Sequence, residues 1–138
     1  MTEQEKLNKE IVIRFNREVL EKGNLSTVHE LIHPGFINHN LPPGAVQGPQ
    51  GIINFITEIL HKALTHITVE ILDQVVEGDK VVTRKTGYGT HVDTFMGIAP
   101  SNKKVAFNII DIIALKNGQY MEHWSIMDIR DVIAKSSS

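Results

Sequence analysis

The residues best suited to chemistry lie in the last extended stretch of the chain, residues 119–130, which reads QYMEHWSIMDIR. The stretch follows Asn117 and Gly118, a dipeptide typical of tight hairpin turns, so we expect it to be a strand. Alternate residues of a strand share a face, and one face here carries Glu122, Trp124, Ile126 and Asp128. A carboxylate on a largely apolar sheet face either forms a buried ion pair or serves as an acid or base whose pKa is raised by burial.

Asp128 is the first candidate for a pocket acid or base, and a structural hydrogen bond or an ion pair with an arginine is the alternative. Trp124 shares its face, and the opposite face carries Met121, His123, Ser125 and Met127. In a two-layer fold one face meets the helices and the other meets solvent or a partner subunit. A single bulge would exchange the two faces, so alternation alone leaves the choice open.

Asp111 is the only charge in the preceding predicted strand, residues 105–115, before Lys116. That strand is apolar on both faces, and an aspartate within it needs a hydrogen-bonding partner. We expect Asp111 to hold a histidine or a backbone donor in place, with direct catalysis as the alternative.

His91 ends the predicted strand that begins at Lys80. It shares a face with Gly87 and Gly89, whose missing side chains either relieve crowding where the sheet bends or leave room for a ligand. A histidine near neutral pH can donate, accept or shuttle a proton, and a satisfied structural histidine is the alternative.

Several other classes of site lack their usual motifs. The chain has no cysteine, which excludes thiolate nucleophiles, disulfides and cysteine-ligated zinc. His29 and His33 are four residues apart, but Pro34 follows and no zinc-protease pattern surrounds them, so we expect no metal site. No nucleophile elbow, dinucleotide fingerprint or phosphate-binding loop occurs.

The composition is that of one ordinary globular domain spanning residues 1–138. The 138 residues are 41% hydrophobic and 22% charged, and the net charge of -2 offers no basic field for nucleic acid. The polar start, MTEQEKLNKE, does not resemble a secretory signal, and no apolar run is long enough to span a membrane. We therefore expect a cytoplasmic protein that binds neither nucleic acid nor membrane.

The elements that must position these residues are helices followed by strands. Helical spacing of apolar residues predicts three helices, which end near Gly23, before Pro34 and near Ala63. Four successive strands follow, beginning near Val69, Val81, Val105 and Gln119, and the tail, residues 133–138, is expected to be disordered. This order predicts an α+β fold with a meandering antiparallel sheet packed against helices.

With these residues in view, the chain resembles the SnoaL-like polyketide cyclase family, whose cone-shaped fold is named after nuclear transport factor two. The resemblance covers about two thirds of the chain in family order. It is carried by FINHN at 36–40, GPQG at 48–51, GYGTHVDTFMGIAPSNKKV at 87–105, IDIIAL at 110–115 and NGQYMEHWSIMD at 117–128.

The resemblance implies a cone-shaped, curved antiparallel or mixed sheet with three amino-terminal helices closing a pocket, and pairing of two subunits through the sheet. Family cyclases close a ring by an intramolecular aldol reaction without metal or organic cofactor, using an aspartate near the end of the last strand. That position is Asp128 here, with His91 as a second catalytic candidate. Substrate-binding residues are predicted at His39, Tyr88, Phe95, Asp111 and Trp124, of which the resemblance suggests His39 and Trp124.

These expectations describe a cofactor-independent acid–base enzyme that abstracts a proton from a small apolar carbonyl compound. Aldol cyclisation of a polyketide-like ester is the first choice, and ketone isomerisation or a non-catalytic ligand-binding or dimerisation module is the alternative. Family cyclases can use a histidine on the strand before the aspartate, and residues 105–115 contain none. An epoxide hydrolase would need an arginine beside two aspartates, and Arg84 lies on the opposite face from His91.

Overall fold

The helices precede most of the sheet, as the sequence predicts. The computed structural model describes residues 1–136. Its helical elements are α1 (Glu3–Phe15), η1 (Asn16–Glu21), α2 (Leu25–Leu31), α3 (Gly48–Asn54), η2 (Phe55–Leu60), α4 (His61–Ala63) and α5 (Ile129–Ser136). The two η segments are π-helical; η1 continues α1 without a break, and η2 joins α3 to α4. The three predicted amino-terminal helices are therefore confirmed.

The first helix starts and stops where its sequence signals lie. Thr2 and Glu5 form a capping box, in which each side chain accepts a hydrogen bond from the other residue's backbone. At the far end, Gly23 takes a φ of 68°, a left-handed conformation that glycine adopts without strain. Asn24 then caps α2 by accepting hydrogen bonds from the N–H groups of Ser26 and Thr27.

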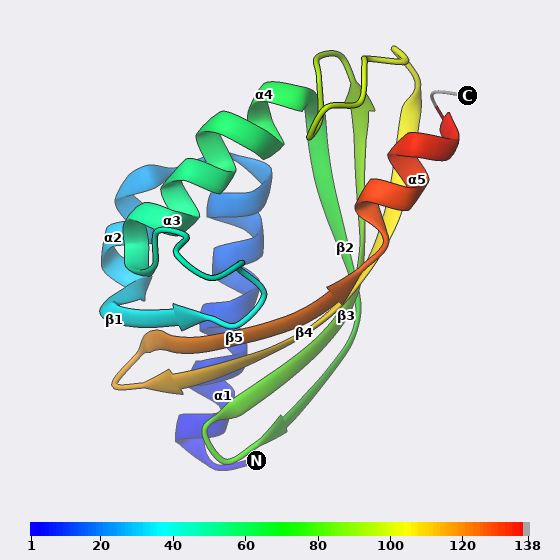
Figure 1. Ribbon diagram of the computed structural model, residues 1–138. Coiled ribbons are helices and arrows are strands. Elements are labelled where there is room, and N and C mark those ends of the chain that lie inside the picture. The colour runs from blue at the N-terminus through cyan, green and yellow to red at the C-terminus, as the bar shows by residue number, and fades with distance from the viewer. Residues whose placement is uncertain (137–138) are drawn as a thin grey trace.

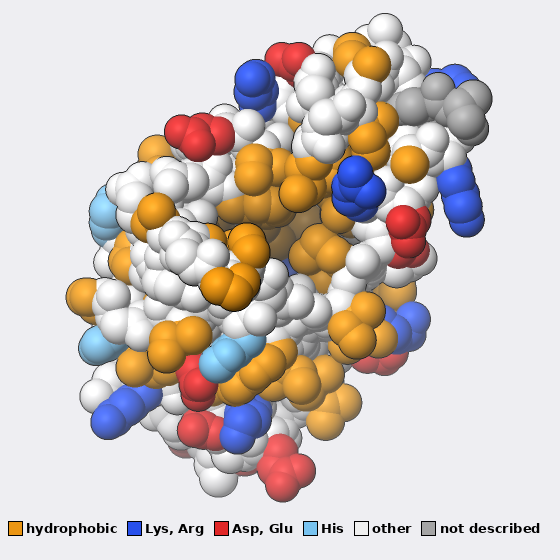
Figure 2. All heavy atoms as spheres, viewed as in Figure 1, with side chains coloured by type: hydrophobic (Ala, Val, Ile, Leu, Met, Phe, Trp, Pro, Cys, Tyr) orange, Lys and Arg blue, Asp and Glu red, His pale blue; other side chains and the backbone are white. Residues whose placement is uncertain are grey.

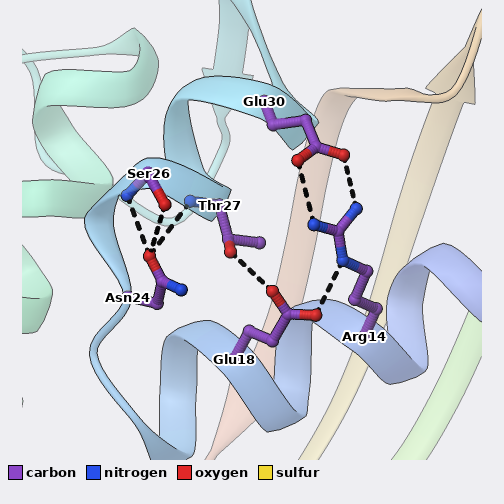
Figure 3. Close-up of polar contacts among 6 residues, drawn as sticks. All are labelled: Arg14, Glu18, Asn24, Ser26, Thr27 and Glu30. Atoms are coloured by element: carbon purple, nitrogen blue, oxygen red, sulfur yellow. Dashed lines mark hydrogen bonds and ion pairs between the residues drawn. The ribbon is translucent and has the colours of Figure 1, made fainter.

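Exposed polar contacts tie the first two helices together (Figure 3). Arg14 on the first helix donates to both carboxylate oxygens of Glu30 on α2, and also to Glu18 one turn further along. Glu18 in turn accepts from the Thr27 hydroxyl at 2.7 Å. The hydrogen bonds from Arg14 lower the pKa of both glutamates.

One mixed sheet contains all the strands of the described range, in the order β1-β5-β4-β3-β2. The strands are β1 (Ile32–Asn38), β2 (Leu64–Glu77), β3 (Lys80–His91), β4 (Lys104–Lys116) and β5 (Gln119–Met127). β2 to β5 form the predicted antiparallel meander, and β1 joins its edge parallel to β5. Figure 1 shows the sheet strongly curved, with the amino-terminal helices over its concave side.

Burial along the central strands separates the concave face of the sheet, which meets the helices, from the outer face. In β4, Val105, Phe107, Ile109 and Asp111 are buried, whereas Ala106, Asn108 and Ile110 between them are exposed. β3 alternates in the same way, with Thr83, Lys85 and His91 on the buried side. Asp111 and Lys85 therefore point toward the helices.

Gly87 on β3 is required by close packing rather than by a turn. A Cβ atom at this position would lie 2.5 Å from the ring of Phe107 on the neighbouring strand, far inside van der Waals contact. The absence of a side chain at Gly87 thus relieves crowding, one of the two alternatives left open by the sequence. The Phe107 ring fills the space beside Gly87.

The carboxyl-terminal prediction needs correction. β5 ends at Met127, and residues 129–136 form α5, where disorder was expected from residue 133. Val132 N–H donates to the Asp128 carbonyl in the first turn of α5. Ile129 and Ile133, one turn apart on the same side of this helix, are both buried. Residues 137 and 138 lie outside the described part of the chain.

Candidate functional site

A cavity of about 770 Å³ lies between the concave face of the sheet and the helices. This volume falls within the range of small-molecule sites. Figure 2 shows the hollow, ringed by hydrophobic side chains. The helices contribute Phe15, Leu20, Ile52, Phe55, Ile56, Ile59 and Leu60, and the sheet contributes Ile67, Val69, Phe107, Ile109 and Ile113.

A small set of polar residues interrupts the apolar lining, mainly along the sheet side. They are Asn38, Asn40, Lys85, Asp111, Tyr120, His123 and Ser125. They come from β1 and the loop after it, and from β3, β4 and β5. Few polar groups in a mostly apolar cavity are typical of sites that orient one ligand.

An ion pair between Lys85 and Asp111 lies at the centre of this polar set. Lys85 Nζ is 2.9 Å from Asp111 Oδ2, and the two side chains are 4% and 7% exposed. Lys85 also donates to Asn16 Oδ1 at 2.7 Å, and Asn16 is itself fixed by donating to the Val12 carbonyl. The pair connects the sheet to the first helix, and its charges compensate each other inside the protein.

Two oxygen atoms beside this pair have no hydrogen-bond partner within residues 1–136. They are Asp111 Oδ1 and Ser125 Oγ, and both are buried. Asp111 and Ser125 are also direct cross-strand partners of β4 and β5, so their side chains leave the same face of the sheet as neighbours. Buried polar atoms are normally hydrogen-bonded, and two unpartnered oxygens facing one cavity indicate a place where a ligand can bind.

His123 lines the cavity, and its hydrogen bond to Asn38 fixes its tautomer. Its Nδ1 lies 3.0 Å from Asn38 Oδ1, an oxygen that also accepts from the Asn40 N–H. Because that oxygen can only accept, Nδ1 carries the hydrogen and Nε2 keeps a lone pair. Burial lowers the pKa of His123, an effect that Asp111 opposes and Lys85 reinforces. The ring is therefore neutral near pH 7.

Tyr120 adds a phenol that stays protonated. It is 3% exposed, and burial together with the negative charge of Asp111 raises its pKa well above the usual range. Phe15 and Phe36 pack against its ring, with centroids 4.7 Å and 6.4 Å away. Tyr120 can thus donate a hydrogen bond from a fixed position without ionising.

Asp128, the sequence's first catalytic candidate, lies away from the cavity lining. Its carboxylate accepts from the backbone N–H of Asn108 at 2.6 Å and from the Asn108 side chain at 3.2 Å. Asn108 is an exposed residue of the outer face. Asp128 therefore closes the end of the β4–β5 ladder through structural hydrogen bonds, one of the two forms of the alternative.

His39 and Trp124 also lie outside the cavity lining, although both were expected in the pocket. Their rings stack with centroids 4.6 Å apart and planes 3° from parallel. His39 Nε2 is 3.0 Å from Glu122 Oε1, and both side chains are more than one third exposed. Trp124 lies on the outer face, because its β4 partner is Ile112 and the inward-facing Asp111 is paired with Ser125.

The remaining predicted residues occupy three further places. His91 is fully buried, with Nδ1 accepting from the Ser101 N–H at 3.4 Å, and Phe95 is buried in the loop after β3. Tyr88 is 40% exposed on the outer face and donates to Glu70. Neither His91, Phe95 nor Tyr88 lines the cavity. Among the predicted site residues only Asp111 does, so the structure does not bring Asp128, His91 and His39 together.

A bulge sets which face of β5 meets the cavity, a choice that alternation alone left open. The hairpin starts with Lys116 opposite Gln119 and Leu115 opposite Tyr120, a register that would pair Asp111 with Trp124. The register shifts by one residue after Leu115, and Asp111 is paired with Ser125 instead. The shift turns His123 and Ser125 toward the cavity and Trp124 away from it.

Lys85 was missed as well. The signal was available, because Lys85 shares its face with Gly87 and His91, and an aspartate on the next strand needed a partner. Arg84, the preceding residue of β3, lies on the outer face, as alternation predicts. It pairs there with Asp73. No arginine lines the cavity within residues 1–136.

Residues 1–136, the described part of the chain, contain neither a candidate metal cluster nor a candidate membrane-spanning helix. No group of three or more histidine, aspartate or glutamate side chains there is arranged to hold a metal ion. No helix of residues 1–136 combines the length and apolar character needed to cross a bilayer.

The sequence profile of the SnoaL-like polyketide cyclases matches residues 10–134. The chain belongs to the SnoaL-like polyketide cyclase family. No curated protein sequence matches the chain at a significant level.

Solved structures of SnoaL-like proteins share the fold over nearly the whole chain. A protein from Jannaschia sp. CCS1, described as a SnoaL-like polyketide cyclase, is 27% identical with a TM-score of 0.86, covering 100% of this chain and 96% of that one. IdmH from Streptomyces antibioticus, described as a polyketide cyclase, is 26% identical with a TM-score of 0.75, covering 93% and 96%. An epoxide hydrolase of M. tuberculosis, at 14% identity, a TM-score of 0.71 and coverage of 97% and 91%, shares the fold alone.

Proposed function

We propose that this chain is a cofactor-independent acid–base enzyme that abstracts a proton from a small apolar carbonyl compound, with Asp111 as the base. The observation that carries the proposal is the unpartnered Oδ1 of Asp111 in an apolar cavity of about 770 Å³. The other carboxylate oxygen is held by Lys85, which fixes the direction of the free one. A positioned carboxylate shielded from bulk water is suited to proton abstraction next to a carbonyl.

The groups around Asp111 fit the charge that this reaction develops. Asp111 Oδ1 would accept the α-proton, leaving an enolate whose negative charge lies largely on the carbonyl oxygen. Tyr120, protonated because burial raises its pKa, would donate a hydrogen bond to that oxygen. Ser125, directly across the strand pair from Asp111, would position a polar group of the ligand.

Aldol cyclisation of a polyketide-like ester is the reaction that we place first, supported by membership of the SnoaL-like family. The enolate carbon would attack a second carbonyl of the same molecule, and the new alkoxide would recover the proton from Asp111. Isomerisation of a ketone uses the same abstraction and returns the proton to a different carbon. Both reactions leave Asp111 ionised at the end of a cycle.

The test is turnover of a panel of polyketide-like esters and ketones by the wild type and by Asp111→Asn. We expect the asparagine variant to lose activity by about 10²-fold or more, because an amide cannot take the proton. Asp79→Asn is the matched control, since Asp79 has a 68% exposed side chain and does not line the cavity. Full activity of Asp111→Asn on a substrate that the wild type converts would overturn the role of Asp111.

A non-catalytic ligand-binding module is the second candidate. It is favoured by the ion pair between Lys85 and Asp111, because a purely structural pair would make the same contact. The two candidates differ in one observable. A binding module would take up apolar carbonyl compounds without exchanging their α-hydrogens with solvent, whereas the proposed enzyme exchanges them.

We also propose that the outer face of the sheet pairs with a second copy of the chain. Support comes from its exposed apolar side chains, with Val75, Tyr88 and Ile110 being 63%, 40% and 50% exposed. Light scattering would report a dimer for the wild type and a monomer for Ile110→Glu. Val46→Glu, in the loop before α3 with Val46 54% exposed, is the control expected to stay dimeric. A monomeric wild type would refute the pairing.

A further inference from the structure

We propose that Lys85 is a catalytic residue that bonds covalently to its ligand, forming an iminium ion with the carbonyl carbon of an aldehyde or ketone. The inference rests on the proposed function, because it uses the same cavity and the same carbonyl ligands. It assigns the step before proton abstraction to an amine that the acid–base scheme leaves as a structural counterion.

The position of Lys85 is unusual for a lysine. Lysines are almost never fully buried, since the ammonium group is strongly hydrated, yet Lys85 is 4% exposed in the middle of β3. It lines the apolar cavity, and no other lysine or arginine within residues 1–136 does so. A desolvated lysine in an apolar pocket is the environment in which this side chain acts as a nucleophile.

Asp111 supplies the proton acceptor that a nucleophilic lysine needs. The ammonium lies 2.9 Å from Asp111 Oδ2, so its proton can pass along an existing hydrogen bond. Transfer of this proton removes both charges of the pair together, so neither group is left as an uncompensated buried charge. The amine then carries the lone pair that attacks a carbonyl carbon.

The reaction balances without any further reagent. The amine adds to the carbonyl carbon, and the carbonyl oxygen takes the proton held by Asp111, giving a carbinolamine with a protonated nitrogen beside the Asp111 carboxylate. Asp111 then removes a proton from nitrogen and delivers it to the hydroxyl, which leaves as water as the carbon–nitrogen double bond forms. In total, one ammonium and one carbonyl compound give one iminium and one water.

Charge conservation in the cavity favours this route. The iminium carries the same positive charge as the ammonium it replaces, and Asp111 is again a carboxylate beside it. No buried charge is left without its partner at the end of the step. The iminium also makes the neighbouring C–H more acidic than in the parent ketone, so Asp111 Oδ1 can remove that proton to form an enamine.

The experiment uses the wild-type protein, 2-naphthaldehyde as an apolar probe, and sodium borohydride. Borohydride reduces an iminium to a stable amine, and digestion followed by mass spectrometry locates the naphthylmethyl group. At one equivalent of aldehyde near pH 7 we expect the main adduct on Lys85. Lys104 is the comparison, since it is exposed and does not line the cavity.

Two variants sharpen the result. Asp111→Asn keeps an oxygen for Lys85 but removes the proton acceptor, so the Lys85 adduct should be lost. Lys85→Arg keeps the positive charge and should give no adduct at position 85 and no turnover. Adducts spread over exposed lysines, with none on Lys85 of the wild type, would overturn the covalent role. If turnover still requires Asp111 in that case, the proposed acid–base function stands without it.

Discussion

Two aspartates at opposite faces of the same strand pair have very different surroundings. Asp111 on β4 faces the helices, pairs with Lys85 and keeps one oxygen unpartnered among residues 1–136. Asp128, just after β5, is half-buried and directs both oxygens to Asn108. The environment of a carboxylate, and not its place near the end of the last strand, determines which of the two can serve a ligand.

The same contrast appears in two neighbouring residues of β3. Lys85 points inward to a buried pair, whereas Arg84 points outward to Asp73, where both side chains are more than half exposed. An exposed pair is screened by water and is weak, but a buried charge depends on its partner. Substitutions on the two faces should therefore differ in how much they lower the free energy of unfolding.

The largest difference is expected from Asp111→Ala. Removing the carboxylate leaves the Lys85 ammonium buried and uncompensated, which costs about 3–5 kcal/mol in the free energy of unfolding. Arg84→Ala on the outer face should cost less than about 1 kcal/mol. Urea unfolding of both variants measures this, and equal losses would mean that the two faces do not differ as described.

Gly87→Ala should have the next largest effect. The added methyl group would collide with the Phe107 ring, and overpacking of this kind costs about 1–3 kcal/mol. Phe107 also lines the cavity, so its displacement should weaken the uptake of apolar ligands. The control is Ala106→Gly, which changes the exposed side of β4 without crowding. Gly97→Ala is less suitable, because Gly97 has a left-handed φ of 86°. A fully stable Gly87→Ala that binds ligand normally would contradict the packing described here.

A smaller effect concerns pH and His123. Burial lowers its pKa in the folded state, so below about pH 6.5 the unfolded chain binds more protons at this residue than the folded one. The contribution of His123 to stability is therefore complete above that pH and is lost as pH falls through the folded-state pKa. His123→Gln should show a weaker loss of stability in urea titrations between about pH 7 and about pH 5. If the pH dependence of His123→Gln equals that of the wild type, His123 is more hydrated in the folded protein than its burial indicates.

The fold could be predicted from the sequence because its signals are local. The helix stop near Gly23 and the Asn117-Gly118 hairpin both act within a few residues, and the structure confirms each of them. The carboxyl-terminal helix α5 was missed because it is short. Its buried residues, Ile129 and Ile133, gain stability from the sheet and not from their own helical propensity.

The site was only partly predictable, because it depends on register. Asp111 could be selected as the single charge in an apolar strand, and it does line the cavity. Ser125 and His123 could not be chosen over Trp124, because the register shift after Leu115 leaves no mark in the alternation of residues. Lys85 was identifiable only together with Asp111, since the pair joins two strands that alternation treats separately.

The most direct measurement compares Asp111→Asn with Asp128→Asn in one assay. The rate of solvent-deuterium exchange at the α-carbon of a carbonyl compound turned over by the wild type reports proton abstraction without depending on the rest of the reaction. We predict that Asp111→Asn lowers this rate by about 10²-fold or more, while Asp128→Asn stays within a few-fold of the wild type. Loss of exchange in Asp128→Asn with full exchange in Asp111→Asn would contradict the assignment of the cavity as the site of chemistry.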